Sequence, residues 1–291
     1  MKVLDDPSGN NLDHAQPSAA HRPSQLVLSL FPGVGLLDRA FELEGYCVVR
    51  GPDLLWGGDV RFFHPPAMIF NGVIGGPPCQ CHSRLSHLVR HVYGPGKVAQ
   101  DLIPEFVRCI EEAQPQWWLS ENVPDSPPPQ PIGYRIHSQI LDNRWVGGTQ
   151  KRRRRITFGR IGATPAHLEL GPELVVFEAV DSCNTVCASG DTSGTERGGI
   201  SGSVSRKVLR HTCEAQGFTE LVEHLCHPVN GPFTVRGAIH AIGNGVALPM
   251  GRAIARAVAR QTTGSSEPMM TSPPGATDGF TEASQEYSGD V

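Results

Sequence analysis

The segment GGPPCQCH, residues 75–82, holds a cysteine in a rigid backbone. Two glycines and two prolines stand directly before Cys79, and the apolar run AMIFNGVI precedes them. The residues after Cys79 can begin a helix, whose N-terminal dipole would lower a thiol pKa from about 8.5 toward neutrality. A rigidly placed, stabilised thiolate is what a covalent nucleophile requires. The ordinary alternative for a single cysteine is a buried structural thiol.

A second motif, LFPGVG, places Gly33 and Gly35 directly after an apolar segment. Their missing side chains would let the backbone approach a ligand at the start of a helix. The same pattern also occurs as a plain tight turn, and the third glycine of the dinucleotide fingerprint would fall at Asp38. The motif therefore disfavours a full NAD site and leaves room for a smaller adenosine ligand.

These motifs stand at the ends of predicted strands. Strands are predicted at residues 25–31, 46–50, 68–74 and 116–122, and helices at 36–45, 97–114 and 248–260. Strands that alternate with helices predict an α/β fold with a doubly wound, mostly parallel sheet and helices on both faces. Such sheets bind ligands at the carboxyl ends of their strands. Trp117 and Trp118 are predicted to be core residues of the fourth strand.

In order along residues 26–260, these motifs resemble those of the cytosine-C5 DNA methyltransferases. GGPPCQ resembles the family's nucleophile motif, LFPGVG its first cofactor motif, and ENV at residues 121–123 its acid motif. QKRRRR supplies Gln150, Arg152 and Arg154 in the QxRxR spacing, and QGF at residues 216–218 and GNGVALPMGRAIARAVA resemble the last two motifs. The resemblance implies a Rossmann-like, S-adenosylmethionine-dependent methyltransferase of compact prokaryotic or phage type that acts on double-stranded DNA.

The resemblance also implies how the residues act. Cys79 would add to C6 of cytosine, which makes C5 nucleophilic enough to take the methyl group. Glu121 would protonate N3 or share its proton, and Arg154 would donate to the O2 side of the ring. Because a base inside a duplex cannot present C6 to a thiolate, the cytosine must be flipped out of the stack.

Three groups of site residues follow from the matched motifs. The catalytic candidates are Cys79, Glu121, Arg154 and Arg152. The expected cofactor contacts are Phe31, Gly33, Gly35, Asp53, Asp59, Pro78, Asn244 and Val246. The expected DNA contacts are Gln80, Ser83, Gln150, Arg153 and Arg155. Without the resemblance, Glu121 could equally cap a turn, and residues 152–155 would be a solvated basic strand end, an exposure that also suits phosphate contact.

The chain departs from the family pattern in the cofactor region. The acid that binds the ribose at the end of the second strand would align with Pro52, so Asp53 is a candidate substitute. Asp59 of the GDV segment stands where the adenine amino group would be bound. Three further departures are His82 for a common Phe, His211 for a common Glu, and the additional thiol of Cys81. All of them leave Cys79, Glu121 and Arg154 in place.

The 291 residues, 39% hydrophobic and 19% charged, suffice for one large domain with an insertion. Residues 1–24 and the acidic tail 263–291 are rich in Pro, Ser, Gly and Thr and are predicted to be disordered. The catalytic and cofactor-binding domain is expected over 25–160 and again over 206–262. Residues 161–205 would form a small, loop-rich target-recognition region, whose shortness favours a short or loosely specified recognition site.

Composition and charge indicate where the protein is found and what it could bind. The net charge of −4 does not exclude DNA, because acids concentrate in the C-terminal tail and bases at residues 151–155. Eight cysteines without an export signal predict thiols, and the spacing of Cys183, Cys187, Cys213 and Cys226 disfavours zinc, so no metal is expected. No apolar stretch approaches about 18 residues and no signal-like apolar segment opens the sequence, which predicts a soluble, intracellular protein. The resemblance implies a cytoplasmic monomer in a prokaryotic or phage-infected cell. A cognate restriction endonuclease is a candidate partner.

Two other functions remain open at this point. The same catalytic residues would serve a tRNA cytosine-C5 methyltransferase, although the QxRxR segment and the separate insertion favour DNA. A protein of a different class, a noncatalytic nucleotide-binding regulator that retains the fold, would explain the altered ribose site. Transfer of a labelled methyl group to DNA, to tRNA or to neither would separate the three.

Overall fold

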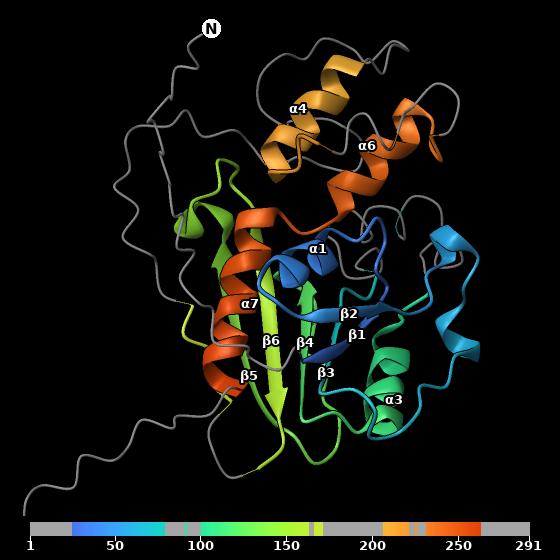
Figure 1. The fold of residues 1–291 in the computed structure, drawn as a ribbon, viewed down its shortest axis with the longest axis vertical. Helices are drawn as coiled ribbons and strands as arrows, with labels where there is room; N and C mark the ends of the chain where they lie inside the picture. The colour runs from blue at the N-terminus through green and yellow to red at the C-terminus, as the bar shows by residue number, and fades with distance from the viewer. Residues whose placement is uncertain are drawn as a thin grey trace, which may run out of the picture.

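The computed structural model describes residues 25–78, 91, 100–162, 166–170, 206–220, 225 and 231–262. A six-stranded sheet with the order β2-β1-β3-β4-β6-β5 forms its centre (Figure 1). The strands are β1 Leu26–Leu30, β2 Cys47–Arg50, β3 Gly72–Gly75, β4 Trp117–Asn122, β5 Arg135–Asp142 and β6 Arg153–Arg160. Strands β1 to β4 pair in parallel, whereas β6 runs antiparallel to both β4 and β5. The predicted α/β fold with a mostly parallel sheet is confirmed.

Helices cover both faces of this sheet (Figure 1). They are α1 Leu36–Leu43, α3 Ile103–Ala113, α4 Arg206–Gln216, α6 Val235–Asn244 and α7 Leu248–Thr262, with the 3-10 helices η1 Leu54–Trp56, η2 Val60–Phe62 and η4 Asn143–Val146. Apolar side chains of α1 and α7 pack on one face and those of α3 on the other. Helices α4 and α6 form a third apolar cluster with Leu36 of α1, beyond the carboxyl ends of the parallel strands.

Two adjacent tryptophans show how β4 joins both layers. Successive side chains of a strand point to opposite faces, so Trp117 packs with α1 and α7 while Trp118 packs with α3. Both are at most 1% exposed, which confirms their prediction as core residues. The rings need space on the neighbouring strands: a side chain on Gly72 would meet the indole of Trp117, and one on Gly159 that of Trp118. The glycines of β3 and β6 therefore let the aromatic core close.

Several predicted boundaries were wrong. The helix predicted over 97–114 begins only at Ile103, because the Asp101 carboxylate accepts from the Ile103 amide and Pro104 occupies the first turn, where its ring suits a helix start. The strand predicted over 68–74 is confined to β3, since Met68 has a left-handed φ of 59°. The β5–β6 pair and helix α6 were not predicted, although Val235, Ala238, Ile239 and Ile242 of α6 recur at helical spacing.

Other predictions concern residues outside the described part of the chain. These are the two tails, residues 1–24 and 263–291, and most of the expected recognition region, 161–205. At the start of that region, Ala166 and Leu168 are buried in the cluster that contains α7, and Gln139 of β5 donates to the Leu168 carbonyl at 2.8 Å. None of the described helices is long and apolar enough to cross a membrane.

Candidate functional site

The expected site residues converge on one edge of the sheet. The carboxyl ends of β1, β3 and β4 meet there, and chain order reverses between the neighbouring strands β1 and β3. Because β6 is antiparallel to β4, its first residues reach the same edge, where Arg155 pairs with Asn122. A cavity of about 920 Å³ lies along this edge, at the topological position where open α/β sheets bind ligands.

The LFPGVG segment forms a tight turn at the end of β1. Phe31, Gly33 and Gly35 all have left-handed φ values, of 56°, 56° and 81°. A side chain on Gly33 would meet no atom within 4 Å, so it is the backbone conformation that favours glycine there. The Gly33 amide donates to the Asp53 carboxylate at 2.8 Å, and its carbonyl accepts from the Trp56 indole at 2.6 Å. The segment after β2 therefore holds this turn in place.

Gly35 has a different reason to be glycine. It stands at the start of α1 and does not line the cavity, but a side chain there would collide with the guanidinium of Arg50. That guanidinium pairs with the buried carboxylate of Asp38 at 2.9 Å, and Ser29 donates to the same carboxylate at 2.5 Å. Burial raises the pKa of Asp38 above its ordinary value, while Ser29 and Arg50 partly offset this.

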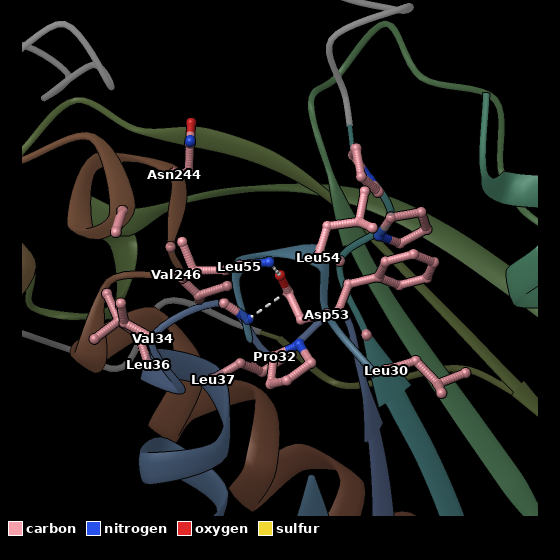
Figure 2. Close-up of a pocket in the computed structure, with 18 of the residues that line it drawn as sticks. Leu30, Pro32, Val34, Leu36, Leu37, Asp53, Leu54, Leu55, Asn244 and Val246 are labelled. Atoms are coloured by element: carbon pink, nitrogen blue, oxygen red, sulfur yellow. Dashed lines mark hydrogen bonds between the residues drawn. The ribbon is translucent and has the colours of Figure 1, made fainter. Parts of the chain in front are cut away.

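Two carboxylates of the expected cofactor site lie in the segment after β2. Asp53 accepts from the amides of Gly33 and Leu55, both at 2.8 Å, and so caps η1 while it lines the cavity. Figure 2 shows both bonds, with Leu54 and Leu55 beside the carboxylate. Asp59 forms a two-oxygen ion pair with Arg61, whose hydrogen bonds lower the pKa of Asp59. Both carboxylates line the cavity.

Glu121 and Arg154 form the polar end of the same cavity. The Glu121 carboxylate lies 2.8 Å from Nε of Arg154, and the two side chains are only 8% and 16% exposed. The ion pair crosses from β4 to β6, so neighbouring antiparallel strands present the acid and the base together. Asn122, the next residue of β4, donates to the Pro77 carbonyl at 3.1 Å. The acid motif is thereby bonded to the Pro-Pro segment that leads to Cys79.

The first two polar residues of the QxRxR motif are buried in a hydrogen-bond network. Gln150 donates to the Gln216 side chain at 2.9 Å and to the Ala215 carbonyl at 2.7 Å. Arg152, which is 0% exposed, donates to the carbonyls of Gly243 and Gly245. These carbonyls flank Asn244, so the network fixes the α6–α7 turn that lines the cavity. In this structure, Gln150 and Arg152 face the protein interior and do not line the cavity.

The other two arginines of the motif differ in exposure. Arg153 is exposed at the start of β6, as a phosphate contact requires. Arg155 is half-buried, and its guanidinium donates to the Pro124 carbonyl at 2.6 Å and to the Ser138 hydroxyl at 3.2 Å. The expectation that both are solvated is therefore wrong for Arg155, because backbone and hydroxyl oxygens next to β6 hold its guanidinium.

Seven of the eight expected cofactor contacts line the cavity: Phe31, Gly33, Asp53, Asp59, Pro78, Asn244 and Val246. Figure 2 places Asn244 and Val246 across the pocket from Leu54. The sequence reading missed Arg61, Arg236 and His240, which line it too. Spacing gives a signal for the last two, because Arg236, His240 and Asn244 recur every four residues and so share one face of α6.

Cys79, Gln80 and Ser83 lie outside the described residues, as do Cys81 and His82. Among the described cysteines, Cys109 and Cys213 are buried and Cys47 is exposed. Burial raises the pKa of the Cys109 thiol to about 11, so it is protonated at neutral pH. No group of three or more His, Cys, Asp or Glu side chains in the described part could hold a metal ion. Of the disfavoured zinc ligands, Cys183, Cys187 and Cys226 fall outside that part.

Comparison of folds agrees with this architecture. The chain aligns with the methyltransferase EhMeth of Entamoeba histolytica, with a TM-score of 0.56 and 12% identity over 82% of this chain and 99% of that one. It aligns with the S. pombe Dnmt2 methyltransferase with a TM-score of 0.52 and 13% identity over the same shares. At these identities the likeness shows a shared fold.

Comparison of sequences shows which proteins part of this chain resembles. The chain is 32% identical over 114 residues to the type II methyltransferase M.FnuDI of Fusobacterium nucleatum, which covers 33% of this chain and 32% of that protein. It is 30% identical over 116 residues to the type II methyltransferase M.NgoPII of Neisseria gonorrhoeae, 33% of each chain. The matches thus span about a third of these relatives. Residues 57–126 match the C-5 cytosine-specific DNA methylase family. The likeness to that family is therefore carried by this segment, about a quarter of the chain.

Proposed function

We propose that this protein transfers a methyl group from S-adenosylmethionine to C5 of a cytosine flipped out of DNA, through a covalent bond to Cys79. One observation carries the proposal: a single cavity is lined both by the Gly33 turn with Asp53 and Asp59 and by the Glu121–Arg154 pair. When one cavity holds both the cofactor and the base, the methyl group can pass directly from the cofactor to the base without contact with water. The two relatives are named type II methyltransferases, which favours DNA as the acceptor.

The residues present fit an adenosine ligand with a charged tail. The cavity of about 920 Å³ can hold both a cofactor and a base. Asp53 keeps unused acceptor capacity beside the Gly33 turn and would take ribose hydroxyls, and Asp59 would accept from the adenine amino group. Leu54 and Leu55 line the cavity although they are 67% and 42% exposed, and they offer apolar surface to a ring. When bound, S-adenosylmethionine supplies an electrophilic methyl group on a sulfonium.

The protein's own residues would carry the rest of the reaction. The Cys79 thiolate bonds to C6, and the electron pair of the C5–C6 double bond becomes available at C5 to take the methyl group. Glu121 protonates N3 or shares its proton, while Arg154 donates to the O2 side, so charge that leaves the double bond is stabilised. Removal of the C5 proton then restores the double bond and expels the Cys79 thiolate. The ion pair between Glu121 and Arg154, 2.8 Å long, supports these roles, because two side chains this close could contact one ring.

The test is methyl transfer itself. The full chain is incubated with labelled S-adenosylmethionine and mixed-sequence DNA, and the product is read by bisulfite sequencing, where we expect 5-methylcytosine at a fixed sequence. Cys79→Ser should abolish transfer and leave binding of S-adenosylhomocysteine within about two-fold, because a hydroxyl is too weak a nucleophile at neutral pH. Cys47→Ser, on the exposed edge of β2, is the matched control.

Other outcomes would replace the proposal. Label on tRNA and none on DNA would make the protein a tRNA methyltransferase. Binding of S-adenosylhomocysteine without transfer to either polymer would favour the noncatalytic regulator. Full activity of Cys79→Ser would remove the thiolate mechanism while the acceptor assignment stood.

A further inference from the structure

Nearly all the charged side chains that line the cavity have a partner within the described residues. Asp59 pairs with Arg61, and Glu121 with Arg154. The buried carboxylate of Asp38 pairs with Arg50, and that of Asp53 accepts from two backbone amides. One arginine of the lining has no such partner among the described residues.

Arg236 is that arginine. It is exposed, it lines the cavity from α6, and it forms no ion pair or hydrogen bond with any residue in the described part of the chain. It stands in the first turn of α6, where a positive charge opposes the helix dipole, so the stability of the helix does not account for it. Nor is it needed to cap α6, because the Thr234 hydroxyl accepts from the Gly237 amide.

Arg236 lines the same cavity as Asp53 and Asp59, the two carboxylates of the segment after β2. Its helix continues into the Asn244–Val246 turn, which lines the cavity beside the Gly33 turn. Asp59, on another part of this lining, would take the adenine amino group. Because the adenine and the amino-acid tail are the two ends of S-adenosylmethionine, a cofactor whose adenine binds Asp59 places its tail elsewhere in the lining, to which α6 contributes Arg236. The amino-acid tail of S-adenosylmethionine carries one carboxylate. Among the arginines of the cavity lining, Arg236 is the one that has no ion pair within the described residues and could receive it.

We propose that Arg236 binds the α-carboxylate of the cofactor and so selects adenosyl ligands that carry an intact amino-acid tail. This inference rests on the proposed use of S-adenosylmethionine. A guanidinium matches a carboxylate with two parallel hydrogen bonds, which gives both affinity and orientation. The interaction would hold the tail while the sulfonium methyl faces the base.

The experiment compares two ligands by calorimetry on the full chain. S-adenosylhomocysteine carries the carboxylate, and its decarboxylated analogue lacks only that group. We expect the wild type to prefer S-adenosylhomocysteine by about ten-fold, and Arg236→Ala to lose this preference by weakening S-adenosylhomocysteine alone. Arg236→Lys should keep part of it, because an ammonium can still pair with a carboxylate. Arg210→Ala, an exposed arginine of α4 outside the cavity lining, controls for net charge and should keep the full preference.

The contrary outcomes are distinct. If Arg236→Ala weakens both ligands equally, the residue acts on the fold of the pocket and the proposal is wrong. If it leaves both unchanged and weakens DNA binding, Arg236 contacts phosphate and the proposal is also wrong. If the wild type binds neither ligand, the proposed function itself fails together with this inference.

Discussion

Replacing Arg152 with methionine tests whether this residue holds the fold or acts in catalysis. The side chain is 0% exposed, and its guanidinium donates at 3.2 and 2.7 Å to the carbonyls on either side of Asn244. Hydrogen bonds to a charged group contribute about 1.5–3 kcal/mol each, and methionine retains much of the packed volume. We therefore expect a loss of about 3 kcal/mol in the free energy of unfolding, which lowers the urea midpoint by about 1 M or more.

The assay is urea unfolding followed by tryptophan fluorescence, with S-adenosylhomocysteine binding as a second measurement. Arg152→Lys should lie between the wild type and Arg152→Met, and Arg153→Met, at the exposed neighbouring position, should unfold with the wild type. Ligand binding should weaken in Arg152→Met, because the turn that carries Asn244 loses its support. An unchanged midpoint combined with lost methyl transfer would refute this reasoning and restore the catalytic role read from the sequence.

Two further predictions concern the turn after β1. Burial raises the pKa of Asp38 above 3.8, so the folded state holds this proton more tightly than the unfolded chain, and the stability that Asp38 contributes should fall as pH rises through its folded-state pKa. Thermal melts of the wild type and of Asp38→Asn give the difference in stability between the two proteins, and the advantage of the wild type should decrease as pH rises from about 4. A difference that does not change with pH would contradict the raised pKa of Asp38. Gly35→Ala should lower the free energy of unfolding by about 1–2 kcal/mol because of the φ of 81° alone, and by more because of the collision with Arg50. Adding Arg50→Ala to this variant should therefore restore part of the lost stability. If the double variant is no more stable than Gly35→Ala, the collision does not contribute.

Local chemistry explains the parts of the fold that the sequence predicted. Residues 26–30 and 72–75 form buried parallel strands, because strands covered on both faces carry continuous hydrophobic runs. Glycine at 33 and 35 marks the turn after β1, since left-handed backbone is costly for other residues. Strand ends in such a sheet share one edge, so the resemblance could group Gly33, Asp59 and Glu121 in one site before any coordinates.

The rest depended on contacts between distant segments. A run of four arginines carries no signal of which one is buried, and the carbonyl partners of Arg152 lie more than ninety residues further along the chain. Asp53 could be named as a ribose ligand but not as the acceptor of the Gly33 amide, because that bond joins the ends of two strands. Arg236 was missed because it belongs to no matched motif. Only the structure shows that it lines the cavity while the other charged side chains of the lining have partners.

The direction of β6 decides whether the Glu121–Arg154 pair can exist. Strand β6 has eight residues and follows β5 in an antiparallel pair, so its first residues lie at the carboxyl edge where β4 ends. If it ran parallel to β4, its first residues would lie at the opposite edge, about 26 Å away at roughly 3.3 Å per residue. Arg154 could not then reach Glu121. The reversal after β5 is therefore what allows a motif from the end of the sheet to complete a site that the parallel strands begin.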